Sequence, residues 1–221
     1  ESVATRCLCL FLFVIATIGC HSNEPSSGQS GSNGRTKAPE RSIDSVADRE
    51  DDSCPERIFD GNILFTSESP LTLLEGVTRV NGRVEIIFTD VTNLEHLRCL
   101  RHVEGSVVIH GNSALANIDG LSSLSFIGGG LAIHVNEALR NVDGLTRITS
   151  VGGNLSIGSN SSLTDIDGLS HITTVRDSLS IRSNPSLTDI EGLSRITSVG
   201  SHLVIENNDS LSNLDALSNL T

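Results

Sequence analysis

The chain has 221 residues, of which 15 are Lys or Arg and 27 are Asp or Glu, so its formal net charge is −12. This acidic balance argues against nucleic acid and against an anionic surface as the binding partner, because both are negatively charged and would repel the chain.

The first 20 residues have the features of an export signal. Arg6 precedes an apolar run over residues 7–18, and a small residue, Gly19, leads to Cys20. A basic flank and a short apolar core before a cleavage point are typical of a secretory signal, and the run is too short for a comfortable membrane span. The segment resembles a bacterial lipoprotein signal, which implies acylation of Cys20. Thr17 departs from the usual leucine of that motif, and ordinary cleavage and an uncleaved anchor remain as alternatives.

Residues 21–53 are predicted to be a disordered tether. They are rich in Ser, Gly and charged residues, and a segment of such low hydrophobicity cannot bury a core. A flexible linker of this length has an end-to-end distance of roughly 30 Å, which suits a domain held away from a membrane. The structured domain is then expected over residues 54–221. Because the chain lacks an initiator methionine and stops within a repeat, we expect a fragment of a longer protein, without the polar cap of a complete solenoid.

A unit of 24 residues recurs through the second half of the chain, with the approximate pattern L-x-I-x-x-N-x-x-L-x-x-I-D-G-L-x-x-I-x-x-V-G-x-x. A fixed period of this size predicts a solenoid, in which each unit buries its apolar face on its neighbours. Leu155 and Ile157 alternate with Ser156, as in a short strand with one buried face. Gly, Asn, Ser and Asp recur too often for long helices. We therefore predict an all-β parallel β-helix of about seven coils, with three short strands per coil. The units begin at Val107, Leu131, Leu155, Leu179 and Leu203.

An asparagine occupies the sixth position of every unit. We expect its amide to turn inward and bond to the backbone of its own and adjacent coils, because no strand partner reaches the groups at such a corner. Asn160 and Asn208 also begin glycosylation sequons, but modification of an inward amide would break the ladder. We therefore interpret the asparagine column as a structural ladder and not as a set of glycosylation sites. The column consists of Asn112, Asn136, Asn160, Asn184 and Asn208.

An acidic residue follows further along each unit, and glycine follows it in four of the five. The first interpretation is a turn in which the carboxylate accepts backbone N–H groups. The alternative is a calcium site, because Asp165 with Asp167, and Asp189 with Glu191, place paired oxygen ligands on one outward face. The column consists of Asp119, Asp143, Asp167, Glu191 and Asp215.

His110 and His134 occupy equivalent places in adjacent units, so their side chains are expected about 5 Å apart. No third ligand type follows in register, and a zinc site needs more than two protein ligands. We interpret both as surface histidines.

The segment before the regular units resembles the start of a receptor L-domain, the ligand-binding module of the insulin and epidermal growth factor receptor ectodomains, which also occurs in bacterial envelope proteins. The resemblance lies in Cys54-Pro55, in Gly61-Asn62 before Ile63, and in the V-x-G-x-V-x-I pattern from Val80 to Ile86. The later Asn184-Pro185-Ser186-Leu187 also matches. The resemblance implies a right-handed parallel β-helix over residues 54–221 but names no ligand. A leucine-rich-repeat-like solenoid is the alternative, although its usual N-x-L spacing is N-x-x-L here.

One departure from that family concerns the cysteines. In the receptors, the equivalent of Cys54 bonds to an upstream cysteine, whereas this chain has only Cys20 and the leader cysteines upstream. Cys99 remains, and the coil that starts at Ile63 is shorter than the others between Val77 and Val80, a corner that the two cysteines would flank. We therefore hypothesise a Cys54–Cys99 disulfide, which suits an exported protein. Two full coils between them would exceed the bridging distance.

No nucleophile with its base, metal triad or phosphate loop is evident. We therefore expect a non-catalytic recognition or adhesion module, exported to a bacterial cell envelope and lipid-anchored at the outer membrane or cell surface, with a protein as partner and no cofactor. A glycan ligand is less favoured because the chain has no Trp or Tyr. The expected contact face is an outward sheet made of Val108, Ala132, Ser156, Ser180 and Val204, flanked by His110, His134, Arg182 and Glu206.

Two other functions remain open. A structural spacer or self-associating envelope scaffold is favoured by open coil ends, which expose unpaired strand edges. The other alternative is a β-helix enzyme that degrades polysaccharides with the help of calcium, because the acidic column could supply acidic groups and calcium ligands along one face. The uniform coils argue against the enzyme, because such enzymes carry long irregular loops.

Overall fold

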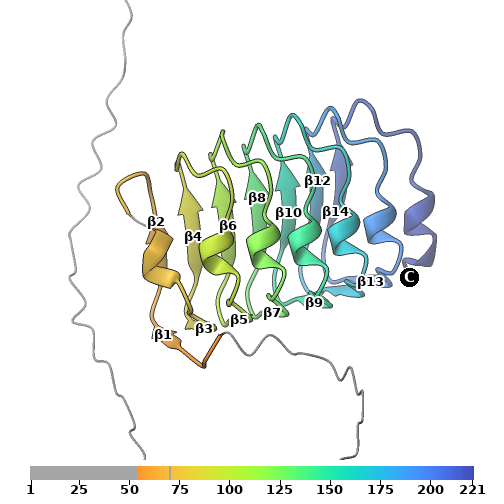
Figure 1. Cartoon of the computed structure of the whole chain (residues 1–221). Coiled ribbons are helices and arrows are strands. Elements are labelled where there is room, and N and C mark those ends of the chain that lie inside the picture. The colour runs from red at the N-terminus through yellow and green to blue at the C-terminus, as the bar shows by residue number, and fades with distance from the viewer. Residues whose placement is uncertain (1–53, 70) are drawn as a thin grey trace, which may run out of the picture. The chain divides into compact units, whose positions relative to one another are not determined.

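The computed structural model describes residues 54–69 and 71–221 (Figure 1). These residues form two parallel sheets of seven strands each, and the only helices among them are short 3₁₀ helices. None of those helices has the length and apolar character needed to cross a bilayer. The predicted signal, Cys20 and the tether lie outside the described residues.

Sheet B contains the longer strands and lies along one side of the solenoid (Figure 1). Equivalent positions of successive repeats pair directly, so that Leu155 lies between Leu131 and Leu179. This register places the alternating apolar residues on one buried face in every coil. The strands are β2 (Ile63–Phe65), β4 (Val84–Ile87), β6 (Val107–His110), β8 (Leu131–His134), β10 (Leu155–Gly158), β12 (Leu179–Arg182) and β14 (Leu203–Glu206).

Sheet A forms a second, narrower side of each coil (Figure 1). Its later strands have only two residues each, of which the second points inward, as in the buried Val151 and Val175. The strands are β1 (Ile58–Asp60), β3 (Arg79–Asn81), β5 (His102–Val103), β7 (Phe126–Ile127), β9 (Ser150–Val151), β11 (Thr174–Val175) and β13 (Ser198–Val199).

The third side is not a strand, so the prediction of three strands per coil is wrong at this side. One turn of 3₁₀ helix stands there, closed by bonds such as Leu169 N–H to Ile166 O at 3.0 Å. Apolar residues spaced by three fall on one face at three residues per turn, which buries Ile166, Leu169 and Ile172. The helices are η1 (Leu71–Leu74), η2 (Glu95–Leu97), η3 (Asp119–Leu121), η4 (Asp143–Leu145), η5 (Asp167–Leu169), η6 (Glu191–Leu193) and η7 (Asp215–Asn219).

Glycine in the D-G-L segment lets these helices stack. A Cβ added at Gly168 would collide with the backbone oxygen of Val142 in the preceding coil, and one at Gly144 would collide with that of Ile118. Close approach between coils, rather than an unusual backbone angle, therefore requires glycine at this position.

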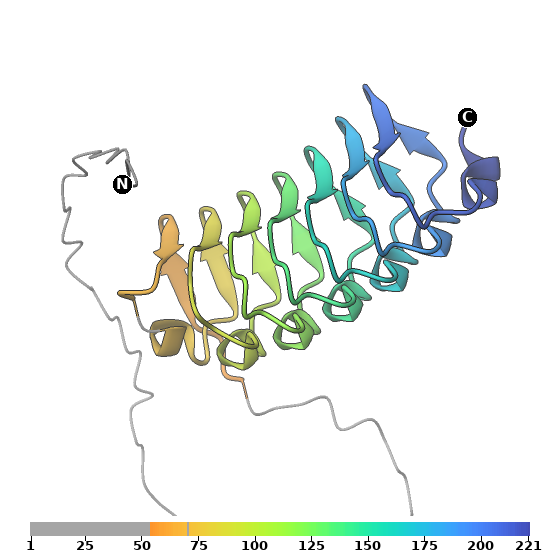
Figure 2. The same cartoon turned by 90° about the horizontal axis from the view of Figure 1, so that it is seen from above.

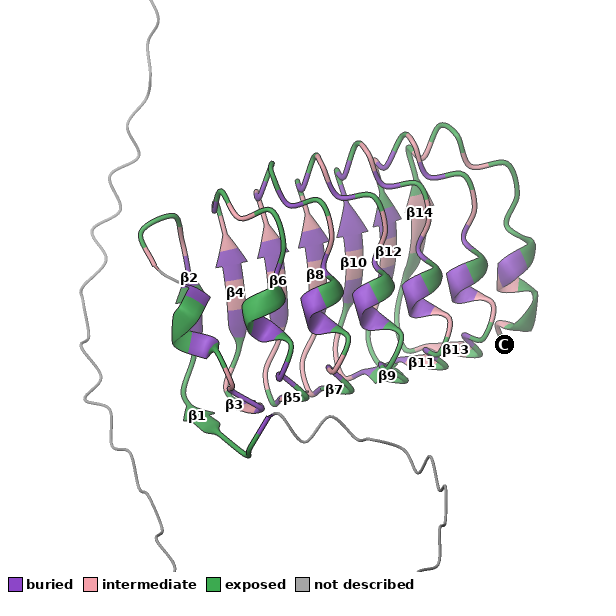
Figure 3. Cartoon of the chain, in the orientation of Figure 1, coloured by how far each residue is buried: buried purple, intermediate pink, exposed green. Residues whose placement is uncertain are grey.

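Aliphatic side chains fill the interior between the three sides (Figure 3). Successive coils lie side by side along one axis (Figure 2), so each apolar column continues from coil to coil. The column of Ile109, Ile133, Ile157 and Ile181 is completely buried. In the coil of β14 the equivalent apolar residues are less covered, and Leu203 is 37% exposed.

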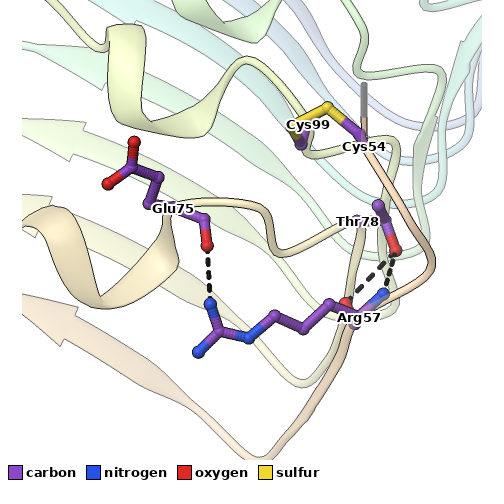
Figure 4. Close-up of a disulfide and its surroundings, with 5 residues drawn as sticks. All are labelled: Cys54, Arg57, Glu75, Thr78 and Cys99. Carbon is purple, nitrogen blue, oxygen red and sulfur yellow. Dashed lines mark hydrogen bonds between the residues drawn. A yellow bond between two sulfur atoms is a disulfide. The ribbon is translucent and has the colours of Figure 1, made fainter. Parts of the chain in front are cut away.

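A disulfide joins Cys54, before β1, to Cys99, before β5, with a Cα–Cα distance of 5.6 Å (Figure 4). Hydrogen bonds hold the segment between Cys54 and β1 on the neighbouring coil. Arg57 Nη1 donates to the Glu75 carbonyl at 2.6 Å, and the Arg57 backbone N–H donates to Thr78 Oγ1 at 3.0 Å. The segment ahead of β1 therefore crosses one coil and reaches the next, which brings the two sulfur atoms within bonding distance.

Replacement of both cysteines by serine (Cys54→Ser with Cys99→Ser) should lower the free energy of unfolding. The bond closes a loop with a sequence separation of 45 residues, and release of such a loop costs about 2–4 kcal/mol. Urea denaturation with and without reductant measures the effect. Reductant should shift the midpoint of the parent chain and leave that of the double variant unchanged; an unshifted parent chain would contradict the bond.

Candidate binding surface on sheet B

A ladder of buried amides forms the corner at which sheet B ends. From Asn136 to Asn208 the side-chain oxygen accepts hydrogen bonds from the asparagine of the preceding coil. The side-chain nitrogen of each ladder asparagine donates to a strand carbonyl. Asn160 Oδ1 accepts from the Asn136 backbone N–H at 3.0 Å and from its Nδ2 at 3.3 Å, while Asn160 Nδ2 donates to Ile133 O at 3.0 Å. The amides of Asn112, Asn136, Asn160 and Asn184 are completely buried, and Asn208 is partly exposed.

The ladder begins one coil earlier than the asparagines do. Thr89 takes the first rung, where both its backbone N–H and its hydroxyl donate to Asn112 Oδ1, at 2.9 and 2.7 Å. The repeat pattern did not reveal Thr89, because a hydroxyl replaces the amide there.

The residue before each rung has a left-handed backbone, which turns the chain sharply at the end of the strand. The φ angles are 51° at Phe88, 71° at Gly111 and 57° at Val135, and Ser159, Ser183 and Asn207 have similar angles. This conformation suits Gly and Asn but is unfavourable for a β-branched side chain.

The expected contact residues lie in two rows on the outer face of sheet B. One row pairs Val108, Ala132, Ser156, Ser180 and Val204 in register. The other pairs His110, His134, Gly158, Arg182 and Glu206. Small side chains keep the middle of the face flat, and an Arg182–Glu206 ion pair of 3.4 Å lies on the last two strands.

The face continues toward the N-terminus beyond the expected residues. Leu64 and Glu85 extend the first row, and Ile87 extends the second. Leu64 is 52% exposed, and Phe88, the residue after Ile87, is 63% exposed. Sequence reasoning missed this end of the face because the 24-residue template starts at Val107. The available signal was the alternation of Val84, Glu85 and Ile86.

The two histidines are held by neighbours on the face. His134 Nε2 lies 2.9 Å from Ser156 Oγ, and the ring of His110 meets Phe88 edge-on with a centroid distance of 5.2 Å. Burial lowers the pKa of His134, and the nearby His110 lowers that pKa further. The neutral form of His134 is therefore favoured, which keeps a positive charge off this part of the face.

The acidic column does not make the turns that were expected of it. Asp119 donates its backbone N–H to Asn117 Oδ1, two residues earlier, at 3.3 Å, and Asp167 donates in the same way to Asp165 Oδ1 at 3.4 Å. The turn acceptor is therefore the residue two positions before the column, because a side-chain oxygen reaches the N–H two residues ahead of it. These acceptors are Asn93, Asn117, Asn141, Asp165, Asp189 and Asn213.

Burial and nearby carboxylates oppose the ionisation of two residues of the column, Asp143 and Asp167. Burial raises the pKa of Asp167, and the charges of Asp165 and Asp189 raise that pKa further. Burial and the neighbouring carboxylates raise the pKa of Asp143 in the same direction.

Hydrogen bonds already occupy two of the four carboxylates that were considered for calcium. Asp165 accepts from the Thr164 hydroxyl at 3.3 Å, and Asp189 accepts from the Thr188 hydroxyl at 3.2 Å. Within the part of the chain that the structure describes, no three His, Cys, Asp or Glu residues are grouped to hold a metal ion.

Sheet A carries a separate polar cluster that satisfies its own charges. Glu104 contacts Arg79, and its Oε1 lies 3.0 Å from His102 Nε2. The His102 side chain, followed by the smaller effect of Arg79, holds the pKa of Glu104 below its usual range. Phe126 stacks on the His102 ring with a centroid distance of 4.2 Å. Within this cluster the charges of Glu104 and Arg79 therefore offset each other.

No protein-family model, curated protein or solved structure matches the chain.

Asn160→Ala should lower the free energy of unfolding by about 3 kcal/mol, because it leaves the buried Asn136 N–H without its acceptor and opens a cavity. Asn154→Ala is the matched control. Asn154 is exposed and accepts one bond from Ser178, so its loss should cost about 1 kcal/mol or less. Chemical denaturation measures the free energy of unfolding of both variants. An equal loss of stability in the two would show that a ladder amide contributes no more than an exposed side chain.

Asp167→Asn should raise the melting temperature at pH 7 by about 1–2 °C. Because the pKa of Asp167 is raised in the folded state, its ionised form opposes folding above that pKa. Acidification protonates the carboxyl and removes this penalty, so the advantage of the variant should fade toward pH 4. Glu56→Gln, outside the column, serves as the control. A gain that persists at low pH would exclude charge repulsion as the cause.

Proposed function

We propose that the chain is a non-catalytic binding module that takes a protein partner on the outer face of sheet B. The observation that carries this proposal is exposed apolar surface on a flat face and along the corner beside it, where Leu64 is 52%, Phe88 63% and Val135 37% exposed. Exposed apolar surface of this kind marks interaction sites, and the buried ladder at the corner keeps the strand ends fixed.

The proposal also includes the type of β-solenoid to which the domain belongs. A right-handed β-helix of the receptor L-domain type is supported by the residue pattern from Cys54 to Ile86 and by the two parallel sheets. The 3₁₀ side is a feature that a leucine-rich-repeat-like solenoid would share, so that alternative is kept.

Two features support placement of the protein at a bacterial cell envelope: the sequence of residues 1–20 and a disulfide in the domain. The Cys54–Cys99 disulfide supports an oxidising compartment. With lipid on Cys20 and a tether over residues 21–53, the module would stand away from the membrane that anchors it.

Site-specific photo-crosslinking on the full chain in its native cells tests the contact face. A photoreactive residue is placed at Ser156 or Ser180 on sheet B, and at Ser150 or Thr174 on sheet A as matched small-residue controls. The proposal expects one defined protein to crosslink from the sheet B positions alone. Equal crosslinking from both sheets would refute the face, and crosslinks to a second copy of the chain would favour the scaffold instead.

A further inference from the structure

Two residues at the corner where the strands of sheet B end, one after β4 and one after β8, are unfavourable for folding on two grounds. Phe88 and Val135 both have a positive φ, and both expose apolar side chains to solvent. The equivalent positions in later coils are Ser159, Ser183 and Asn207, which are polar. Because backbone strain and exposed apolar surface both lower stability, their coincidence points to a function at this corner.

Gly111 shapes the surface between these two residues. Its backbone is also left-handed, and a Cβ there would lie 2.5 Å from Phe88 Cδ1, so the Phe88 ring occupies the space of the missing side chain. The His110 ring supports Phe88 edge-on. We call the surface of Phe88, His110, Gly111 and Val135 the corner platform.

Acidic side chains lie at the rim of the corner platform. Asp90 and Glu137 each stand two residues beyond a platform residue, immediately after a ladder rung, and both are exposed. Neither takes part in an ion pair with any residue of the described ranges. Arg83, which precedes β4, is paired with Glu85 at 3.3 Å.

An apolar platform with an unpaired acidic rim fits a ligand of complementary pattern. We propose that the corner platform is the anchor for a polypeptide partner that presents an apolar side chain flanked by Lys or Arg. This inference deepens the proposed function and rests on it, because it names the chemistry of the partner and the residues that hold it. Central apolar contacts ringed by polar groups usually dominate the affinity of an interface.

The probe is a displayed library of random dodecapeptides, selected on the full chain and counter-selected on the Phe88→Ser, Val135→Asn double variant. The expected result is enrichment of peptides in which an apolar residue has Lys or Arg within three positions on either side. Enrichment of acidic or uncharged peptides, or no enrichment over the double variant, would overturn the proposal.

The single variant Val135→Asn separates binding from folding. Asn tolerates a left-handed backbone, so the melting temperature should rise by about 2–4 °C, while affinity for an enriched peptide should fall at least about tenfold. Ser183→Val is the matched control, because it places valine at the equivalent position two coils away. It should lower the melting temperature and leave peptide affinity within about twofold.

The two proposals fail in different ways. If Val135→Asn binds the peptides as the parent chain does, while Ser156 and Ser180 still crosslink to a partner, the corner platform is refuted and the contact face stands. If no partner crosslinks from sheet B in the parent chain, the proposed function itself is refuted.

Discussion

The inward asparagine amide is the interaction on which the rest of the domain depends. A buried amide is costly unless both its oxygen and its nitrogen find partners, and here those partners belong to neighbouring coils. Asn136 bonds to Ile109 in the preceding coil and to Asn160 in the next. Each coil must therefore keep the same register as its neighbours, or two rungs lose their bonds together. The ladder fixes the strand register, the left-handed residue before each rung, and the edge of the outer face.

Regular and irregular positions occupy different parts of this surface. From β10 onward the outer face carries small or internally paired residues, as Ser156 and the Arg182–Glu206 pair illustrate. The departures from the repeat gather in the first coils, where Thr89 replaces an asparagine and Phe88 occupies a position better suited to a polar residue.

The sequence predicts the stacked parallel strands because their apolar alternation, at Leu155 and Ile157 for example, is periodic and strong. The third side escapes prediction because Ile166, Leu169 and Ile172, spaced by three, are compatible with a loop, a strand or a 3₁₀ turn, and only hydrogen bonds within the coil distinguish them. In the same segment, the Asp-Gly pair at residues 167–168 predicts a turn whose acceptor is the Asp167 carboxylate. The acceptor in the structure is the side chain two residues earlier, Asp165. The N-terminal end of the face was missed because the first coils are 21 and 23 residues long, out of step with the later 24.

The disulfide has a consequence for where the surface can operate. Each coil pairs only with the coils before and after it, so most of the solenoid can open locally, one coil at a time. Cys54 and Cys99 are the exception within the described residues, because their bond skips a coil and encloses Phe88 in the covalent loop. In a reducing compartment that loop would open, and the first residue of the corner platform would lose its covalent support. Reduction would leave the hydrogen bonds of Phe88 and Thr89 in place, so its consequence would be a lower barrier to opening the first two coils together rather than a new arrangement of the surface.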